Sequence, residues 1–105
     1  MGNPITLRLH REDNRAEIEI RVRHPMDPGN AFPPASGRSR PPLFLQTMII
    51  QLNDRALVEG QLSASLSSNP KFLFSFSGIK AGDKFTISCT DNKGNEFKSE
   101  IVAQS

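Results

Sequence analysis

The sequence contains a single cysteine and neither tryptophan nor tyrosine. One cysteine excludes an intramolecular disulfide framework and a zinc site built from cysteines. Seven phenylalanines are the only aromatic residues, so they must supply the large side chains of the core. No stretch is long and apolar enough to span a membrane, and the opening "MGNPITLRLHRED" lacks the pattern of a signal peptide. Composition alone therefore favours a soluble cytoplasmic protein.

Charge of either sign is also modest. The chain has a net charge of +2, 23% charged residues and a total of 105 residues. Its basic residues are scattered, whereas nucleic-acid binding usually shows a concentrated basic stripe. The length predicts one domain over residues 1–105, large enough to bury a core without disulfides or metals.

What the sequence does have is a period of two. In 16–22, for example, Ile18, Ile20 and Val22 alternate with charged residues, as expected for a strand with one buried face. Short strands of this kind are separated by turns, and no segment shows helical periodicity. The pattern predicts an all-β fold, an immunoglobulin-like antiparallel β-sandwich of about seven strands. The expected strands are 5–9, 16–22, 43–52, 55–60, 61–66, 72–76, 85–89 and 97–102.

Most of the prolines lie in 24–42, a stretch too long for an ordinary loop of so small a domain. It opens with "HPMDPGN", which is compatible with a metal site, a catalytic corner or a turn. Pro25 favours an extended His24, and Asp27, Pro28 and Gly29 are typical turn residues. We interpret the stretch as structural first, with Met26 packed on the core edge or against a partner.

Side chains suited to catalysis are not gathered anywhere in the sequence. Cys89 shares the parity of Phe85 and Ile87, which predicts a buried, unreactive thiol. His10 is expected in solvent at a strand end, far along the chain from His24. The aspartates at 27, 54, 83 and 91 all fall in predicted turns, where they bond the local backbone. We therefore expect no enzyme, no catalytic residue, no cofactor and no metal.

The strand 43–52 is apolar on both parities. Leu45 and Ile49 share one parity, while Phe44, Met48, Ile50 and Leu52 share the other. We expect Leu45 and Ile49 to lie on the side away from the core, under the long loop or against another protein. With His24 and Met26 at the loop, these are the four predicted partner-interface residues.

The order of several segments resembles the SoxZ family, the Z subunit of the bacterial Sox sulfur-oxidation system. The segments are His24-Pro25-Met26 with Gly29, then "PPLFLQTMIIQLN" (41–53), "SSNPKFLFSFSG" (67–78), "KAGDK" (80–84) and "DNKG" (91–94). The resemblance covers about residues 5–102. Cys89 and Pro28 depart from the common family pattern.

This resemblance implies a non-catalytic subunit that forms a heterodimer with a SoxY-type partner. In the family, SoxY carries thiosulfate-derived sulfur on a cysteine in a glycine-flanked C-terminal tail, whereas this chain ends "IVAQS". It also implies the periplasm, reached by export together with a partner that bears a twin-arginine signal. Two alternatives stay open: a copper-handling protein using His24 and Met26, and a self-associating immunoglobulin-like module.

Overall fold

The computed structural model describes residues 3–27, 29, 41–62 and 66–104 of the 105-residue chain. All regular secondary structure in these ranges is β-strand, in seven elements. They are β1 (Ile5–Glu12), β2 (Arg15–Val22), β3 (Leu45–Leu52), β4 (Arg55–Gln61), β5 (Lys71–Ser77), β6 (Lys84–Asp91) and β7 (Glu96–Val102). The predicted all-β class is confirmed. No helix in the described part of the chain has the length and apolarity to cross a membrane.

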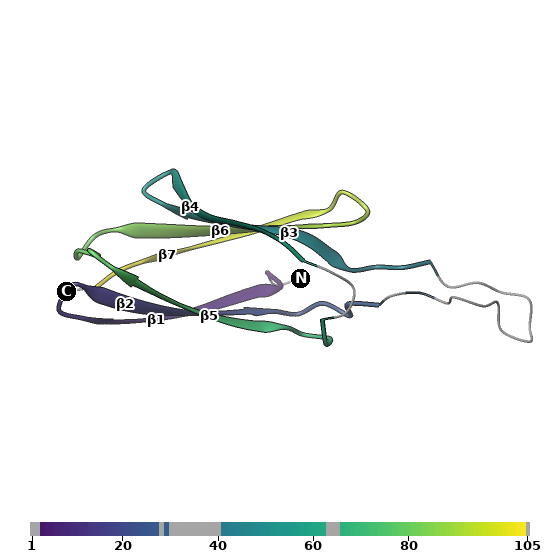
Figure 1. Cartoon of the computed structure of the whole chain (residues 1–105), viewed down its shortest axis with the longest axis horizontal. Helices are drawn as coiled ribbons and strands as arrows, with labels where there is room; N and C mark the ends of the chain where they lie inside the picture. The colour runs from purple at the N-terminus through teal and green to yellow at the C-terminus, as the bar shows by residue number, and fades with distance from the viewer. Residues whose placement is uncertain (1–2, 28, 30–40, 63–65, 105) are drawn as a thin grey trace, which may run out of the picture.

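The strands form two antiparallel sheets that pack face to face (Figure 1). One sheet has the order β1-β2-β5 and the other the order β4-β3-β6-β7. This is an immunoglobulin-like arrangement in which β4 pairs with β3 in the four-stranded sheet and does not join the sheet of β1, β2 and β5. The predicted sandwich of about seven strands is therefore confirmed.

Period-two alternation places one side of each strand in the core. On β2, Ile18 and Ile20 are fully buried, whereas the flanking Glu17 and Arg21 are exposed. On β6, Phe85, Ile87 and Cys89 are fully buried, and the ring of Phe85 stacks on that of Phe76 with centroids 5.7 Å apart. The two sheets therefore share one core between their inner faces.

A β-bulge corrects the expectation for strand 43–52. The β3–β6 register shifts between Leu45 and Thr47, which inserts one residue and reverses the parity of the strand. Leu45 therefore points inward with 0% exposure, together with Met48 and Ile50, whereas Ile49 points outward and is half-buried. The prediction that Leu45 and Ile49 share an outer face is wrong, because sequence parity cannot register an inserted residue.

The segments between the strands follow the predicted turn chemistry in most places. Gly82 and Gly29 have φ values of 92° and 80°, as expected for turn glycines. The separate strand expected over 61–66 is not formed as such. Gln61 ends β4, Leu62 continues its pairing through a bond from its N–H to Gln46 O, and residues 63–65 lie outside the described residues. Of the long loop 24–42, residues 28 and 30–40 also lie outside them.

The two sides of the sandwich differ. On one side β1 lies against β7, which closes the sandwich. On the other side, the ring of Phe76 on β5 stacks on that of Phe85 on β6. Since β6 lies two strands inward from β4 in its sheet, β4 extends beyond the edge of β5. The inner-face residues Phe72 and Phe74 of β5 and Val58 of β4 are partly buried, as are Leu7, Leu9, Phe97 and Ile101 on the side of β1 and β7. Among the described residues, no strand of the three-stranded sheet lies beyond β5 on this side.

Candidate partner interface

The His-Pro-Met corner follows β2 and is built by hydrogen bonds to distant residues. The N–H of His24 donates to Asn69 Oδ1 at 3.0 Å, and the N–H of Asn69 donates to the carbonyl of His24 at 2.7 Å. The imidazole Nδ1 of His24 accepts the N–H of Met26 at 3.0 Å. Met26 has a φ of 48°, a strained conformation for an L-residue, which the His24 hydrogen bond helps to fix.

Both side chains of this corner are buried rather than displayed. His24 is 5% exposed and Met26 is 3% exposed. The thioether Sδ of Met26 lies 3.3 Å from the N–H of Leu45, which donates to it. Met26 thus packs on the core edge, one of the two locations expected for it. Three of the four predicted interface residues, His24, Met26 and Leu45, are covered by this chain itself.

Two sets of hydrogen bonds hold the base of the long loop 24–42. Asp27 and Leu43 exchange backbone hydrogen bonds of 2.6 and 2.7 Å across the base of the loop. Asn92, in the turn between β6 and β7, accepts the N–H of Phe44 at 2.8 Å and donates its amide to Pro42 O at 3.0 Å. Figure 1 shows this turn and the base of the loop at the same end of the sandwich.

Asp91 anchors that turn, and it is a functional candidate that the sequence did not reveal. It is 2% exposed and accepts the N–H groups of Lys93 and Asn95 at 2.9 and 2.8 Å, plus the Asn95 side-chain amide at 2.9 Å. Burial alone would raise the pKa of Asp91, but these hydrogen bonds outweigh it and lower the pKa. The "DNKG" signal identified the turn without showing that its carboxylate is buried.

His24 and Asp91 also interact electrostatically. Burial lowers the pKa of His24, and the negative charge of Asp91 opposes part of that effect. Since Nδ1 accepts a hydrogen bond, the proton of the neutral imidazole belongs on Nε2, which has no hydrogen-bond partner among the described residues. The corner is therefore a buried cluster of polar groups around a neutral histidine.

The side chains proposed for copper already form hydrogen bonds within this cluster. Of the atoms that would bind copper, His24 Nδ1 and Met26 Sδ each accept a backbone N–H. Over the residues that the structure describes, no three His, Cys, Asp or Glu side chains are grouped so as to hold a metal ion.

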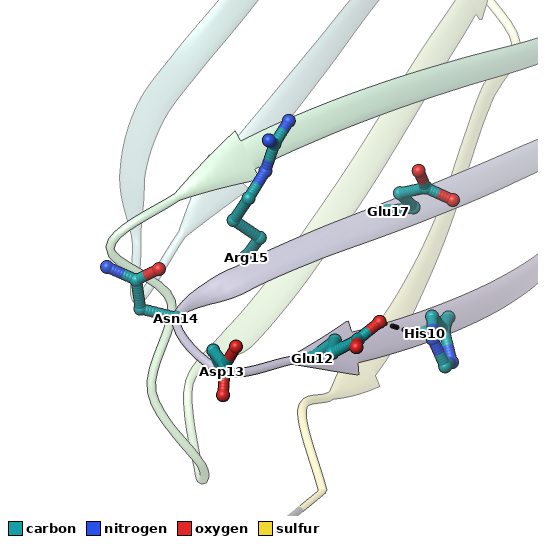
Figure 2. Close-up of a pocket in the computed structure, with 6 residues that line it drawn as sticks. All are labelled: His10, Glu12, Asp13, Asn14, Arg15 and Glu17. Carbon is teal, nitrogen blue, oxygen red and sulfur yellow. Dashed lines mark ion pairs between the residues drawn. The ribbon is translucent and has the colours of Figure 1, made fainter.

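A second polar region lies at the hairpin between β1 and β2 (Figure 2). There His10, Glu12, Asp13, Asn14, Arg15 and Glu17 line an open hollow of about 450 Å³. The only ion pair drawn is between His10 Nε2 and Glu12, at 3.9 Å, and both side chains are at least 75% exposed. His10 is in solvent as predicted. Exposed pairs of this kind are weak, so the hollow offers no preorganised acid–base chemistry.

Cys89 is fully buried in the core, as predicted. Burial raises the pKa of its thiol to about 11. A thiol of this pKa is almost entirely protonated near neutral pH and is therefore a poor nucleophile.

The two outer faces of the sandwich differ in charge. The outer face of β1-β2-β5 carries charged or titratable side chains along its centre, including Arg8, Glu17, Glu19 and Arg21. The outer face of the other sheet has an uncharged centre, formed by cross-strand pairs of β3 with β6. We call this the uncharged face, and it consists of the half-buried residues Thr47, Ile49, Gln51, Ser88 and Thr90, together with Thr86, which is 4% exposed.

Ile49 lies in the middle of the uncharged face. It pairs with Ser88 on one side and with Glu59 of β4 on the other, and it borders a hollow of about 360 Å³ between β3 and β4. Centres of protein–protein interfaces are depleted in charged residues. Ile49 is thus the one predicted interface residue that the structure leaves accessible.

These features define a class: a β-sandwich whose described residues show a surface suited to protein contact and no assembled catalytic or metal site. Comparison with protein families then gives a match to the family described as "Sulphur oxidation protein SoxZ" over residues 6–102. The chain belongs to the SoxZ family, as the resemblance predicted, and takes part in sulfur oxidation. A search of curated proteins returned no match.

Proposed function

We propose that this chain is the non-catalytic subunit of a sulfur-carrier heterodimer, which pairs with a SoxY-type partner. The partner holds the sulfur intermediate on its C-terminal cysteine, and this chain supplies the scaffold that binds the partner. Membership of the SoxZ family supports the sulfur-oxidation role. The buried, high-pKa Cys89 supports a division of labour in which the sulfur is carried elsewhere.

The observation that carries the proposal is the uncharged face. Of the two outer sheet faces, this one has no charged residue in its central pairs, and it has an apolar side chain in the middle at Ile49. Charged residues surround these pairs: Glu59 on β4, Lys84 at the start of β6, and Glu96, Lys98 and Glu100 on β7. The centres of specific interfaces are depleted in charged residues, and their rims are polar.

The test is an Ile49→Asp variant, which places a carboxylate in the centre of the uncharged face. We expect heterodimer formation with the SoxY-type subunit to weaken by at least about tenfold, because the charge would be desolvated without a partner. Circular dichroism should show a folded domain, since Ile49 faces outward. The matched control is Thr6→Asp, at an exposed position of β1 on the charged outer face. Equal affinity of both variants for the partner would refute this placement of the interface.

The proposed compartment is the periplasm, reached by export as a folded pair with the signal-bearing partner. Export as a pair requires the interface to form first, which an accessible apolar residue at the centre of a sheet face favours. Cell fractionation with and without the partner gene tests this. Periplasmic recovery of the chain in the absence of the partner would contradict co-export.

A further inference from the structure

Among the described residues, β5 is an edge strand, and it belongs to the sheet opposite the uncharged face. Only one edge of β5 is paired, through the β2 register. The N–H of Val22 donates to Pro70 O at 3.0 Å, and in an antiparallel pair the bonded positions alternate. Phe72, Phe74 and Phe76 therefore bond to β2, while the peptide groups of Lys71, Leu73, Ser75 and Ser77 point to the free edge.

Within the part of the chain that the structure describes, this edge lacks the usual protection against strand addition. Natural edge strands are blunted by several charges, prolines, bulges or a covering element. Across its seven residues β5 has no proline and no register shift, and Lys71 is its only charged residue. Leu73, in the middle of the strand, is 66% exposed.

The sheet that faces β5 has one strand more than the sheet of β5. Because β4 projects past β5, a strand added to the β5 edge would lie beneath β4, with its inner side chains near Val58, Phe72 and Phe74. A second copy of the whole domain would not fit this way, since its own β3 would then occupy the position of β4. The geometry therefore favours an extended segment over a second sandwich.

The charges around the edge indicate the chemistry of the segment. Lys71 is exposed at one end of β5, and the guanidinium of Arg15 donates a hydrogen bond to Ser75 Oγ at 3.2 Å. Of the nearby carboxylates, Glu19 is bonded to Arg21 at 3.0 Å and Glu17 lies one strand further from the edge. The neighbour that β5 already accepts, β2, places isoleucine inward and glutamate outward.

We propose that the free edge of β5 binds an extended segment of a partner protein by strand addition, with apolar side chains facing inward under β4 and acidic side chains facing outward beside Lys71 and Arg15. Backbone hydrogen bonds to Leu73, Ser75 and Ser77 hold the segment, and the alternating side chains select it. This inference does not depend on the proposed partner at the uncharged face.

The probe is a synthetic peptide of about nine residues in which isoleucine and glutamate alternate, long enough to cover β5. We expect it to bind the full-length protein, as measured by fluorescence anisotropy of a labelled peptide. Hydrogen exchange followed by NMR should show new protection at the amides of Leu73, Ser75 and Ser77. The amides of Phe72 and Phe74 are already bonded to β2, so their protection should stay unchanged.

Two variants separate the backbone and charge contributions. Ser75→Pro removes an N–H that points to the free edge and should abolish measurable binding, while Lys71→Glu should weaken it about threefold. The matched control, Lys98→Glu on the edge strand β7, should bind as the unmodified protein does. A peptide with lysine in place of glutamate should bind more weakly.

The proposal is overturned if the peptide fails to bind, if protection does not alternate along β5, or if Ser75→Pro binds normally. Protection of the same amides in the absence of peptide, together with a dimer in light scattering, would also overturn it in favour of self-pairing. Ile49→Asp should leave peptide binding intact. Failure at the β5 edge and failure of the proposed heterodimer are therefore distinguishable.

Discussion

We expect the protonation of His24 to make the free energy of unfolding depend on pH. Burial lowers the pKa of His24 below its ordinary value of 6.5, so the folded protein disfavours the imidazolium. Protonation at Nδ1 would also remove the acceptor for the N–H of Met26. The unfolded chain, with an ordinary pKa, binds the proton more readily.

The sign of the effect follows from this difference. Stability is at its full value above about pH 6.5 and falls as the pH drops below it, because the unfolded state takes up a proton that the folded state does not. The fall ends once the pH is below the folded pKa. One proton gives a slope of at most about 1.4 kcal/mol per pH unit. For a domain of this size, 1 kcal/mol corresponds to a Tm shift of about 4–8 °C.

Carboxylates titrate in a different range. The pKa values of Asp83 and Asp91 are lowered from 3.8, the former mainly by the N–H of Lys80 and the latter by Asn95 and Lys93 in spite of burial. Their stabilising contribution is present above about pH 4 and is lost only below it. Asp83 and Asp91 therefore add no slope between pH 5 and 6.5, the range in which His24 acts.

The assay is urea unfolding followed by circular dichroism at a series of pH values, since the chain has no tryptophan or tyrosine for fluorescence. A His24→Asn variant keeps an acceptor near the position of Nδ1 but does not titrate, so its stability should be flat between pH 5 and 6.5. The control, His10→Gln, alters the exposed histidine and should keep the slope. The reasoning is refuted if His24→Asn retains the slope or if His10→Gln loses it.

Three further predictions concern the core and the turn beside the corner. Phe85→Ala, which empties a fully buried site at the centre of the sandwich, should cost about 3–5 kcal/mol in urea unfolding, and a loss under 1 kcal/mol would contradict the packing described. Asp91→Ala leaves the N–H groups of Lys93 and Asn95 without their acceptor and should cost about 3 kcal/mol, whereas Glu96→Ala, an exposed neighbour, should change stability little. Cys89 should react with a disulfide reagent only as fast as the protein opens, and immediately in urea; rapid reaction of the native protein would show that the thiol is accessible.

Much of the fold could be predicted from the sequence because the signals are local. Alternation along 16–22 and 85–89 correctly predicted two strands and their buried faces, including the burial of Cys89. A strand repeats every two residues whatever it pairs with, so its inner and outer positions can be recognised without knowledge of its neighbours. Gly29 and Gly82 were identifiable as turn positions for the same reason.

The candidate site was less predictable because it depends on pairing between distant strands. The bulge at Leu45 and Thr47 arises where β3 meets β6, and it moved Leu45 from the expected outer face into the core while leaving Ile49 outside. His24 meets Asn69 and lies in the electrostatic reach of Asp91 only because β2, β5 and β6 are stacked in one sandwich. No local pattern in the chain encodes these encounters.

The sequence by itself thus determined the strands, the turns, the unreactive cysteine and, through the order of its motifs, the SoxZ family. Tertiary structure alone decided which residues are available to a partner. Ile49 remains accessible because the bulge sets the parity of β3, and β5 is an edge strand of the described sheets because β4 pairs with β3 in the other sheet. Periodicity is a property of one strand, whereas exposure is a property of how the strands are assembled.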